Sequence, residues 1–580
     1  MGNQEISKIL FELAEFYEMQ EIPFKPRAFE RAYEALGVLS DDIEEIYKKE
    51  GLKGLEKIPN VGKGIAERIE EYLKTGHIKE YDKLKKKFPV DISGLSAIEG
   101  VGPKAIKVLY EKLKIKNVKE LEEAARAGKL RKLPRMGEKL EAKILKGIAF
   151  QNGDGGGKRF ALGEMLPLAR KIRERLLKVN GVEKVEIAGS ICRMQETIGD
   201  LDFLAISKEP KKICEYFSKM PEVNHVYAKG ETKVLVRLNS PAREGIDADL
   251  RVLPRESFGA ALQYFTGNKD HNIEVRKIAI KRGYKLNEYG LFCGKKNIAA
   301  ETEEEVYKKL GMEMPPPEMR LNQGEIELAL NKKIPELIGY GDLKGDLQIQ
   351  TSWTDGKNSI EEMAREAEKL GHEYIAITDH TRSLAMTGGS DEKKLLRQMS
   401  EIDKIDQKLK IENYKVKILK GAEVNIMKDG LLDIDDETLA KLDIVGAAVH
   451  SLFNLSREDQ TARIIKAMEN PNVDTIFHPT GRVINKRKPY DVDMEKIINA
   501  AKRTGTILEI DAHPWRLDLK DEHIRMAREA GVKMVIDTDA HSTYEMHYLE
   551  YGIAQARRAW CTKENILNTK SLKEFLKSLK

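Results

Sequence analysis

Short apolar runs recur roughly every thirty residues after Gly345, and helical stretches lie between most of them. The runs read DLQIQ, YIAIT, VKILKGAEV, LDIVGAAV, VDTIF, TILEI and KMVID. Strands that are buried on both faces have such continuous apolar sequences, and strands that alternate with helices form parallel sheets. Seven such units favour a closed parallel (β/α)7 barrel over the alternative, an open doubly wound sheet. A long charged helical stretch at 391–412 interrupts the third unit, so we expect a distorted barrel.

Histidines concentrate in this C-terminal region, which holds eight of the chain's 11. Several stand where an apolar run ends, as in IAITDH, GAAVHS, TIFHP and VIDTDAH. Because strand ends on one face of a barrel meet in a single site, we expect these side chains to converge there: His380, Glu423, His450, His478, Asp539 and His541. Imidazoles mixed with carboxylates suit zinc or manganese better than magnesium. Four further histidines lack the pattern and are expected to be surface or packing residues: His372, His513, His523 and His547.

The stretch ETIGDLDFLAIS (196–207) places Asp200 and Asp202 in an otherwise buried strand. Two carboxylates on one face of a strand repel each other and are costly to bury, so a positive charge is expected beside them. GIDADLRVLP (245–254) supplies a second acidic strand, with Asp247 and Asp249 on one face. Three carboxylates from two adjacent strands are the ligand set for two magnesium ions. Strand alternation alone does not choose between Asp247 and Asp249 as the third ligand.

A Gly-Ser turn precedes the first acidic strand, in VEKVEIAGSICRMQ (182–195). The Ser190 hydroxyl and the amides of the turn are suited to a nucleotide's terminal phosphate, with Arg193 as a cationic partner. A two-metal site beside such a turn can activate a 3′-hydroxyl and neutralise a leaving pyrophosphate. The combination indicates nucleotidyl transfer.

Two similar glycine turns join apolar helices near the N-terminus, in IPNVGKGIAERIEEYL (58–73) and LSAIEGVGPKAIKVLYEKL (95–113), and LRKLPRMGEKLEAKILKGI (130–148) is a looser third copy. The turn glycines let backbone N–H groups point outward at a helix N-terminus, where they can bind a phosphate without reading a base. These glycines are Gly62, Gly64, Gly100 and Gly102. The basic side chains nearby are Lys63, Arg68, Lys104 and Lys107. A single copy is equally compatible with an ordinary glycine-capped turn, but the repetition favours helix-hairpin-helix motifs that bind DNA.

The net charge is only +5 over 580 residues, so affinity for a polyanion must come from local patches such as these turns. A chain of this length requires several domains. The four cysteines are scattered without a C-x-x-C pair, which argues against a disulfide framework or a thiolate zinc site. We find neither a secretion signal nor an apolar run near the ~18 residues of a membrane span, and expect a cytoplasmic protein without a membrane partner.

The segments AGSICR, GDLDF, ADLRVLP and QYFTGNKDHNIEVR, followed by LNEYGLF, together resemble a family X DNA polymerase of the DNA polymerase beta type. The resemblance covers roughly residues 1 to 312 and implies that Mg²⁺, dNTPs and primed or gapped DNA are bound. It implies that the catalytic metal ligands are Asp200, Asp202 and Asp249. The residues implied to bind the triphosphate are Gly189, Ser190 and Arg193. Those implied to line the sugar are Tyr264, Phe265 and Gly267, and those facing the minor-groove side of the nascent pair are Asn272 and Arg276.

Two positions depart from the beta-type pattern. The first of two adjacent arginines in the phosphate motif is replaced by Cys192. The lysine that forms a Schiff base with an abasic sugar falls at Arg68, and an arginine stays protonated and cannot serve as that nucleophile. We therefore expect phosphate binding at the first turn without lyase chemistry.

The C-terminal region resembles a PHP domain, which microbial family X polymerases often carry. The resemblance implies up to three metal ions and a 3′-to-5′ exonuclease, and it adds Asp355 in TSWTDG to the six ligands named above. Arg482 and Arg516 are weaker candidates for holding a phosphate. Where the family generally has H-x-H, this chain has Gln348 and Gln350. A glutamine amide is a poor ligand for zinc or manganese, so we expect a weakened metal site and a slower nuclease.

The resemblance divides the chain into a lyase-like helical domain (1–92), fingers (93–152), a nucleotidyltransferase palm of α+β type (158–254), a thumb (255–314), a linker (315–344) and the PHP barrel (345–580). The expected function is gap filling in DNA repair. The alternatives are a template-independent nucleotidyltransferase acting on RNA ends, a DNA-bridging scaffold with both sites inactive, and a PHP domain that is only structural.

Overall fold

The computed structural model describes residues 3–37, 43–58, 60–96, 101–133, 136–137, 140–141, 144–145, 159–239 and 245–579. The chain divides into two compact units. One comprises Met1–Arg159 and Asn272–Leu286, and the other comprises Phe160–His271 and Asn287–Lys580. No helix within these described ranges is long and apolar enough to cross a membrane. The four cysteines are free thiols.

The first unit is helical in its described part. Its helices are α1 (Asn3–Met19), α2 (Lys25–Gly37), α3 (Ile43–Glu56), α4 (Lys63–Thr75), α5 (Lys79–Lys87), α6 (Ile92–Ser96), α7 (Pro103–Leu113), α8 (Val118–Arg126), η1 (Leu130–Lys132) and most of α14 (Lys269–Lys281). One apolar core contains buried residues from α1, α4 and α7, including Leu10, Leu13, Ile69 and Ile106. Both glycine turns therefore belong to one packed body. The junction at 151–158 and the turn glycine Gly100 lie outside the described residues.

A five-stranded palm sheet with the order β2-β4-β7-β6-β5 opens the second unit. Its strands are β2 (Val182–Ala188), β4 (Asp200–Ser207), β5 (Val223–Lys229), β6 (Lys233–Leu238) and β7 (Ile246–Val252), and only the β4–β7 pair is parallel. Leu201 and Phe203 pack with α10 (Leu162–Leu177) and α12 (Pro210–Ser218) on one face. Leu204 packs with α13 (Phe258–Thr266) on the other. Since strand residues alternate, Asp200 and Asp202 share the α13 face.

The remaining elements between the palm sheet and the barrel are short. They are β1 (Phe160–Ala161), which pairs with β3 (Thr197–Ile198), then α11 (Gly189–Cys192), η2 (Arg255–Ser257), β8 (Lys285–Asn287), β9 (Gly290–Cys293), β10 (Lys296–Ala299), α15 (Glu303–Lys309), η3 (Pro317–Met319) and α16 (Glu325–Leu330). The segment expected to be a linker contributes two fully buried ionisable side chains, Arg320 and Glu325. Glu325 is 2.7 Å from Nδ1 of His271, and Arg320 donates to Glu303 at 2.6 Å. This buried hydrogen bond and this buried ion pair fix the segment against the polymerase domains.

The predicted barrel is confirmed. Seven parallel strands run in sequence order: β11 (Gly345–Ile349), β12 (Tyr374–Ile377), β13 (Lys417–Asn425), β14 (Ile444–Ala448), β15 (Thr475–Ile476), β16 (Ile507–Asp511) and β17 (Met534–Asp537). A parallel bridge between Ile349 and Ala540 brings the last strand back to the first. Sequential order excludes the doubly wound alternative, in which the strand order reverses at a switch point.

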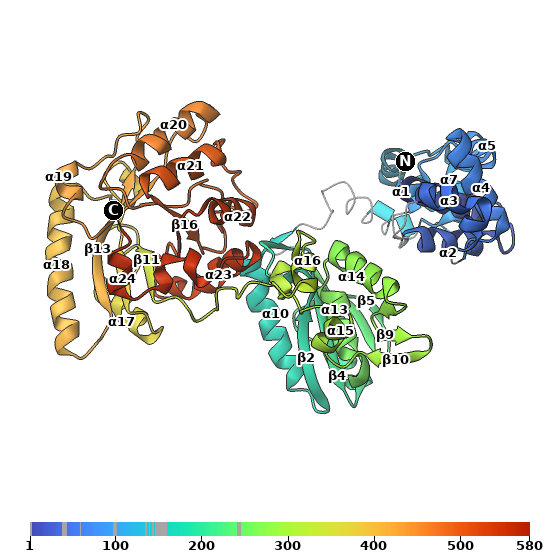
Figure 1. Ribbon diagram of the computed structural model, residues 1–580, viewed down its shortest axis with the longest axis horizontal. Helices are drawn as coiled ribbons and strands as arrows, with labels where there is room; N and C mark the ends of the chain where they lie inside the picture. Colours follow the sequence, from blue (N-terminus) through green and yellow to red (C-terminus); the bar gives the residue numbers. More distant parts are fainter. Residues whose placement is uncertain are drawn as a thin grey trace. The chain divides into compact units, whose positions relative to one another are not determined.

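Helices surround the strands of the barrel (Figure 1). They are α17 (Ile360–Lys369), η4 (Ala385–Thr387), α18 (Glu392–Ile411), α19 (Asp436–Leu439), α20 (Arg457–Met468), α21 (Met494–Thr504), α22 (Asp521–Ala530), η5 (Glu545–Tyr548), α23 (Leu549–Arg558), η6 (Lys563–Asn565), η7 (Leu567–Thr569) and α24 (Leu572–Leu576). The charged stretch that was expected to distort the third unit is the long helix α18. Its N-terminus is capped by the Asp391 side chain, which accepts a hydrogen bond from the backbone N–H of Lys394.

The palm sheet and the barrel share an apolar core. Leu517 and Ala554 of the barrel are buried in the same cluster as Leu162 and Phe203 of the palm. A Cβ on Gly163 would lie 2.2 Å from the Pro514 side chain, so only glycine permits this approach. Polar contacts surround the core. Arg170 pairs with Glu550 at 2.7 Å, Arg482 with Glu196 at 2.8 Å, and Arg558 donates to the Met194 carbonyl. Arg482, a weaker phosphate candidate, is thus engaged by the palm.

His372 in the barrel gives the stability of this fold a pH dependence. Its ring is buried, neither ring nitrogen has a hydrogen-bond partner in the structure, and burial lowers its pKa to about 4. The unfolded chain takes up this proton near pH 6.5 whereas the folded chain does not, so stability is complete above that pH and falls as the pH drops towards 4. At pH 5 we expect a loss of about 2 kcal/mol relative to pH 7.

Denaturation followed by tryptophan fluorescence tests this expectation, because all three tryptophans lie in the barrel region. His372→Leu should remove this part of the loss, whereas His225→Leu, at an exposed position, should leave it in place. An unchanged pH dependence in His372→Leu would assign the acid sensitivity to other groups.

Candidate functional site

The palm carboxylates lie beside each other on adjacent strands. Asp202 is in register with Asp249, and Asp200 is in register with Asp247. Burial, together with the charges of Asp200 and Asp249, raises the pKa of Asp202 to about 7. A cation bound here would remove this electrostatic cost. The structure therefore places the three predicted ligands on one face of the sheet, close enough that Asp200 and Asp249 raise the pKa of Asp202. That they hold a divalent metal stays a prediction.

Asp249 is better placed than Asp247 to be the third ligand. Asp247 pairs with Arg237 at 2.9 Å. Asp249 contacts Arg251 at 2.9 Å, yet its Oδ1 atom is buried without a hydrogen-bond partner in the structure. A buried carboxylate oxygen without a partner is costly, and a metal ion would satisfy it. This oxygen distinguishes the two residues that the sequence pattern left equivalent.

The Gly-Ser turn packs closely against the carboxylate of Asp202. Gly189 has a φ of +71°, and a Cβ there would lie 2.4 Å from Oδ2 of Asp202. The position therefore requires glycine for both its conformation and its space. The hydroxyl of Ser190 is buried without a hydrogen-bond partner in the structure. Arg193 donates to the Thr266 carbonyl at the end of α13. The turn thus places a free hydroxyl and an arginine next to the carboxylate pair.

The predicted sugar-lining residues follow at the end of α13. The rings of Tyr264 and Phe265 meet edge to face at a centroid distance of 5.1 Å. The Arg251 guanidinium lies 4.5 Å from the Phe265 ring centre, which connects this end of α13 to the acidic strand β7. Gly267 ends the helix with a φ of +60°. Asn272 and Arg276 lie on α14, where Arg276 Nε donates to the Asn272 carbonyl at 3.3 Å.

The two glycine turns have matching backbones. Gly62 and Gly102 are the N-cap residues of α4 and α7, both are extended, and neither helix has a side-chain cap. A Cβ at either glycine would meet open space. Lys63 and Lys104 are exposed beside these turns. Uncapped N–H groups next to exposed lysines suit a phosphate oxygen.

The Arg68 side chain is paired within the domain, whereas Lys63 beside the same turn is exposed. Its Nε donates to Glu80 at 2.9 Å, and its other guanidinium nitrogens contact Glu80 and the Gly64 carbonyl. Burial is the largest influence and acts to lower the pKa of Arg68, but the interactions with Glu80 and Tyr17 together outweigh it and raise the pKa. The side chain is a protonated partner of Glu80.

Glu423 is the centre of the barrel site. It is fully buried near the end of β13, and three imidazoles reach it. His478 Nε2 and His450 Nε2 lie 2.8 Å and 3.0 Å from Oε1, and His380 Nδ1 lies 3.1 Å from Oε2. Burial acts to raise the pKa of Glu423, but His380 and His450 outweigh it and hold the pKa well below its usual range. Four of the six strand-end residues predicted to converge therefore meet at this carboxylate, Glu423 included.

Two groups of ligand atoms in the barrel are close enough to hold metal ions. One consists of His380, Glu423 and His450, and the other of Asp355, His380 and His541; within each group the atoms lie within 4.8 Å of one another. The groups share His380, whose Nε2 faces Asp355 and whose Nδ1 faces Glu423. Several buried nitrogen and oxygen atoms here lack hydrogen-bond partners in the structure, including His478 Nδ1 and Gln350 Oε1. Mixed imidazole and carboxylate donors without partners fit Zn²⁺ or Mn²⁺.

Gln350 lies inside this cluster, and its Nε2 donates to Glu423 Oε2 at 2.8 Å. The residue expected as a weakened ligand therefore also orients the central carboxylate. Gln348 is fully buried, and its amide has no hydrogen-bond partner in the structure.

Asp539 and Arg516 form the other side of the barrel site. Arg516 Nε lies 3.4 Å from Asp539 and 3.6 Å from Asp511. Asp539 and His478 have positive φ angles of 50° and 30°, a strained conformation that often marks functional residues. Asp511 was missed by the sequence analysis, although an aspartate that ends the apolar run TILEID was a usable signal.

Family models match four segments of the chain. They describe a helix-hairpin-helix domain at 1–78, a SAM-like helix-hairpin-helix tandem at 92–149, a DNA polymerase beta thumb at 261–321 and a PHP domain at 346–501. The thumb match includes Arg320, which the fold places against Glu303.

Curated relatives agree with these models. The chain is 37% identical over 585 residues to the DNA polymerase/3′-5′ exonuclease PolX of Bacillus subtilis, and the match covers 100% of both chains. A probable phosphatase of Thermoanaerobacter sp. is 34% identical over 235 residues, which are 38% of this chain and 89% of that protein. A probable phosphatase of Acetivibrio thermocellus is 34% identical over 197 residues, 33% of this chain and 75% of that protein. The full-length match spans the palm carboxylates and the barrel cluster alike. The chain therefore belongs to the family X DNA polymerases of the PolX type, which join helix-hairpin-helix and polymerase domains to a PHP domain.

Proposed function

We propose that the chain is a DNA-templated DNA polymerase that adds dNTPs to a 3′-hydroxyl and fills short gaps during DNA repair. One observation carries this proposal. Asp202 on β4 lies in register with Asp249 on β7, and the Gly189 turn packs against Asp202. Asp200, Asp202 and Asp249 would hold Mg²⁺, which would supply the activation of the hydroxyl and the neutralisation of the pyrophosphate. Ser190 and Arg193 bind the triphosphate, and Tyr264 and Phe265 bound the sugar.

The helical unit gives the polymerase its preference for a gap. Gly62 and Gly102 present uncapped helix N-termini to DNA phosphates, and Lys63 and Lys104 add charge without reading sequence. Arg68, paired with Glu80, supports phosphate binding and no Schiff-base chemistry.

Primer extension on gapped DNA tests this proposal. We expect extension of a one-nucleotide gap with the nucleotide that the template specifies, and faster extension when the downstream strand carries a 5′-phosphate. Addition that ignores the template would support the template-independent nucleotidyltransferase instead. An absence of any nucleotide addition would favour a DNA-bridging scaffold.

We propose further that the barrel is a 3′-to-5′ exonuclease that uses Mn²⁺ or Zn²⁺. The convergence of three imidazoles on Glu423 supports this reading. The metal ligands are Asp355, His380, Glu423, His450, His478, Asp539 and His541. A metal ion held there would polarise the phosphodiester and activate water. Arg516, 3.4 Å from Asp539, adds positive charge beside the site.

The variant Gln350→His tests the role of the altered front strand. Imidazole is a stronger ligand for Mn²⁺ or Zn²⁺ than an amide oxygen, so we expect half-maximal exonuclease rate at a several-fold lower metal concentration. Gln350→Leu is the matched control, because it removes the hydrogen bond to Glu423 without adding a ligand, and it should raise the metal requirement. If the wild type degrades no 3′ end in Mn²⁺ and Gln350→His changes nothing, the barrel is structural.

A further inference from the structure

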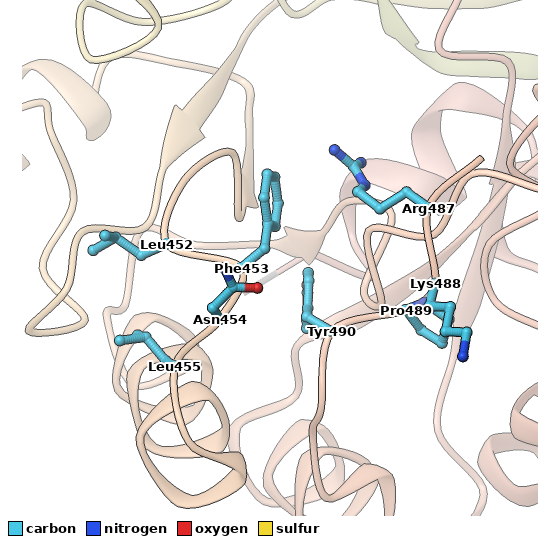
Figure 2. Close-up of a pocket in the computed structure, with 8 residues that line it drawn as sticks. All are labelled: Leu452, Phe453, Asn454, Leu455, Arg487, Lys488, Pro489 and Tyr490. Atoms are coloured by element: carbon cyan, nitrogen blue, oxygen red, sulfur yellow. The ribbon is translucent and has the colours of Figure 1, made fainter.

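A pocket of about 640 Å³ is lined by loops that follow the predicted metal ligands His450 and His478 in sequence. None of its lining residues is part of the proposed polymerase or metal sites. Its lining comes from two loops, Leu452 to Leu455 and Arg487 to Tyr490. Figure 2 shows the side chains of Phe453, Tyr490 and Arg487 extending towards the same side of the pocket, whereas Lys488 extends away from them. The volume lies in the range of small-molecule sites.

Both walls of the pocket are joined to predicted metal ligands. Leu452 follows His450 by two residues. On the other wall, the Tyr490 hydroxyl donates to the Pro479 carbonyl at 2.8 Å, directly after His478. Arg487 Nε donates to the Gly481 carbonyl at 2.8 Å, in the same loop. A strand whose scissile phosphate lies at the cluster would therefore place its neighbouring nucleotide at this pocket.

The lining offers aromatic faces and positive charge. The rings of Phe453 and Tyr490 are stacked, with an interplanar angle of 15° and a centroid distance of 6.2 Å. The Arg487 guanidinium lies 4.4 Å from the Phe453 ring centre. Within the described residues Arg487 has no ion pair, and none of the lining side chains is acidic. Aromatic rings that stack a base, next to a cation for its phosphate, are the means by which proteins bind single-stranded DNA without reading sequence.

The walls are held in place by strained or tight backbone. Leu452 has a φ of +57°, and buried Arg463 donates to the Ser451 carbonyl before it at 2.9 Å. Gly481 also has a φ of +57°, and a Cβ there would lie 2.6 Å from the Tyr490 ring. Strain of this kind persists where the surrounding structure fixes a functional geometry.

We propose that this pocket binds the 3′-terminal nucleotide of the strand that the barrel hydrolyses, with the base stacked on Phe453 and the phosphate paired with Arg487. The proposal rests on the proposed exonuclease function and adds its substrate contact. Because the lining carries stacking faces instead of a set of groups matched to one base edge, all four bases are accepted. A 3′ end that lacks its terminal base makes only part of these contacts.

Fluorescence of 2-aminopurine at the 3′ terminus tests binding without catalysis. Stacking on Phe453 quenches the base, so the full-length wild type should quench it on binding, and Phe453→Leu should abolish most of this quench. Phe453→Trp should restore it. Lys502→Ala is the control, because Lys502 is exposed on α21 and does not line the pocket, and it should quench like the wild type.

The companion measurement is exonuclease KM on a recessed 3′ end with and without the terminal base. In the wild type the abasic end should have about tenfold higher KM, and Phe453→Leu should make the two substrates equal. Arg487→Gln should raise KM for both ends. If the wild type degrades DNA but the ratio of KM values stays unchanged in Phe453→Leu, the pocket proposal is overturned. If the quench depends on Phe453 while no 3′ end is degraded, the pocket holds and the exonuclease function fails.

Discussion

Asp249→Asn is expected to lower the rate of nucleotide addition about a thousandfold, because it removes a charged metal ligand that stabilises the transition state. The buried Oδ1 atom without a hydrogen-bond partner is the structural reason for the size of this effect. Asp247→Asn, two residues earlier on the same strand, breaks only a half-exposed pair with Arg237 and should leave the rate within a few-fold of wild type.

Single-turnover primer extension in Mg²⁺ measures both rates, and a gel-shift assay on gapped DNA provides the control. Both variants should bind DNA as the wild type does, since the glycine turns are unaltered. A severe loss in Asp247→Asn with normal activity in Asp249→Asn would reverse the assignment of the third ligand.

Glu423→Gln is expected to abolish exonuclease activity, with a fall of at least a thousandfold, and to leave polymerisation unchanged. The substitution keeps the size of the side chain but removes the one negative charge that three imidazoles face. Metal affinity should fall with it, because a neutral amide replaces a carboxylate ligand. Metal content measured by atomic emission and 3′-end degradation in Mn²⁺ report the two effects separately.

Glu366→Gln is the matched control for this variant. It removes another glutamate beside a histidine of the same barrel, since Glu366 lies 3.3 Å from His547, and neither residue is a predicted metal ligand. It should retain both activities. A Glu423→Gln enzyme that keeps its metal and its nuclease would show that the cluster is not the catalytic centre.

Local patterns in the sequence were sufficient for most of the fold. Alternation in DLDFLAI placed Asp200 and Asp202 on one face, and the structure confirms that this face is opposite to Phe203. The seven apolar runs each became a strand of the barrel, because strands buried on both faces leave an unambiguous apolar signal.

Contacts between distant segments could not be predicted in this way. The sequence indicated that Glu423 belongs to the site, but its position at the centre depends on how three separate strand ends meet. Gln350 was expected only as a poor ligand, and its hydrogen bond to Glu423 joins residues 73 apart. Asp249 could be separated from Asp247 only by resemblance, because strand alternation places both on one face. The pairing of Asp247 with Arg237, ten residues away on β6, is fixed only by the fold.

The apolar core common to the palm sheet and the barrel limits how this enzyme can change over generations. Leu517 and Ala554 pack among the palm residues Leu162 and Phe203, so deleting the barrel would expose part of the palm's interior to water. A substitution at Glu423 carries no such penalty for the palm. Single substitutions at the metal ligands can therefore inactivate the nuclease during evolution without unfolding the barrel. Deletion of the barrel is disfavoured, because the palm core depends on it.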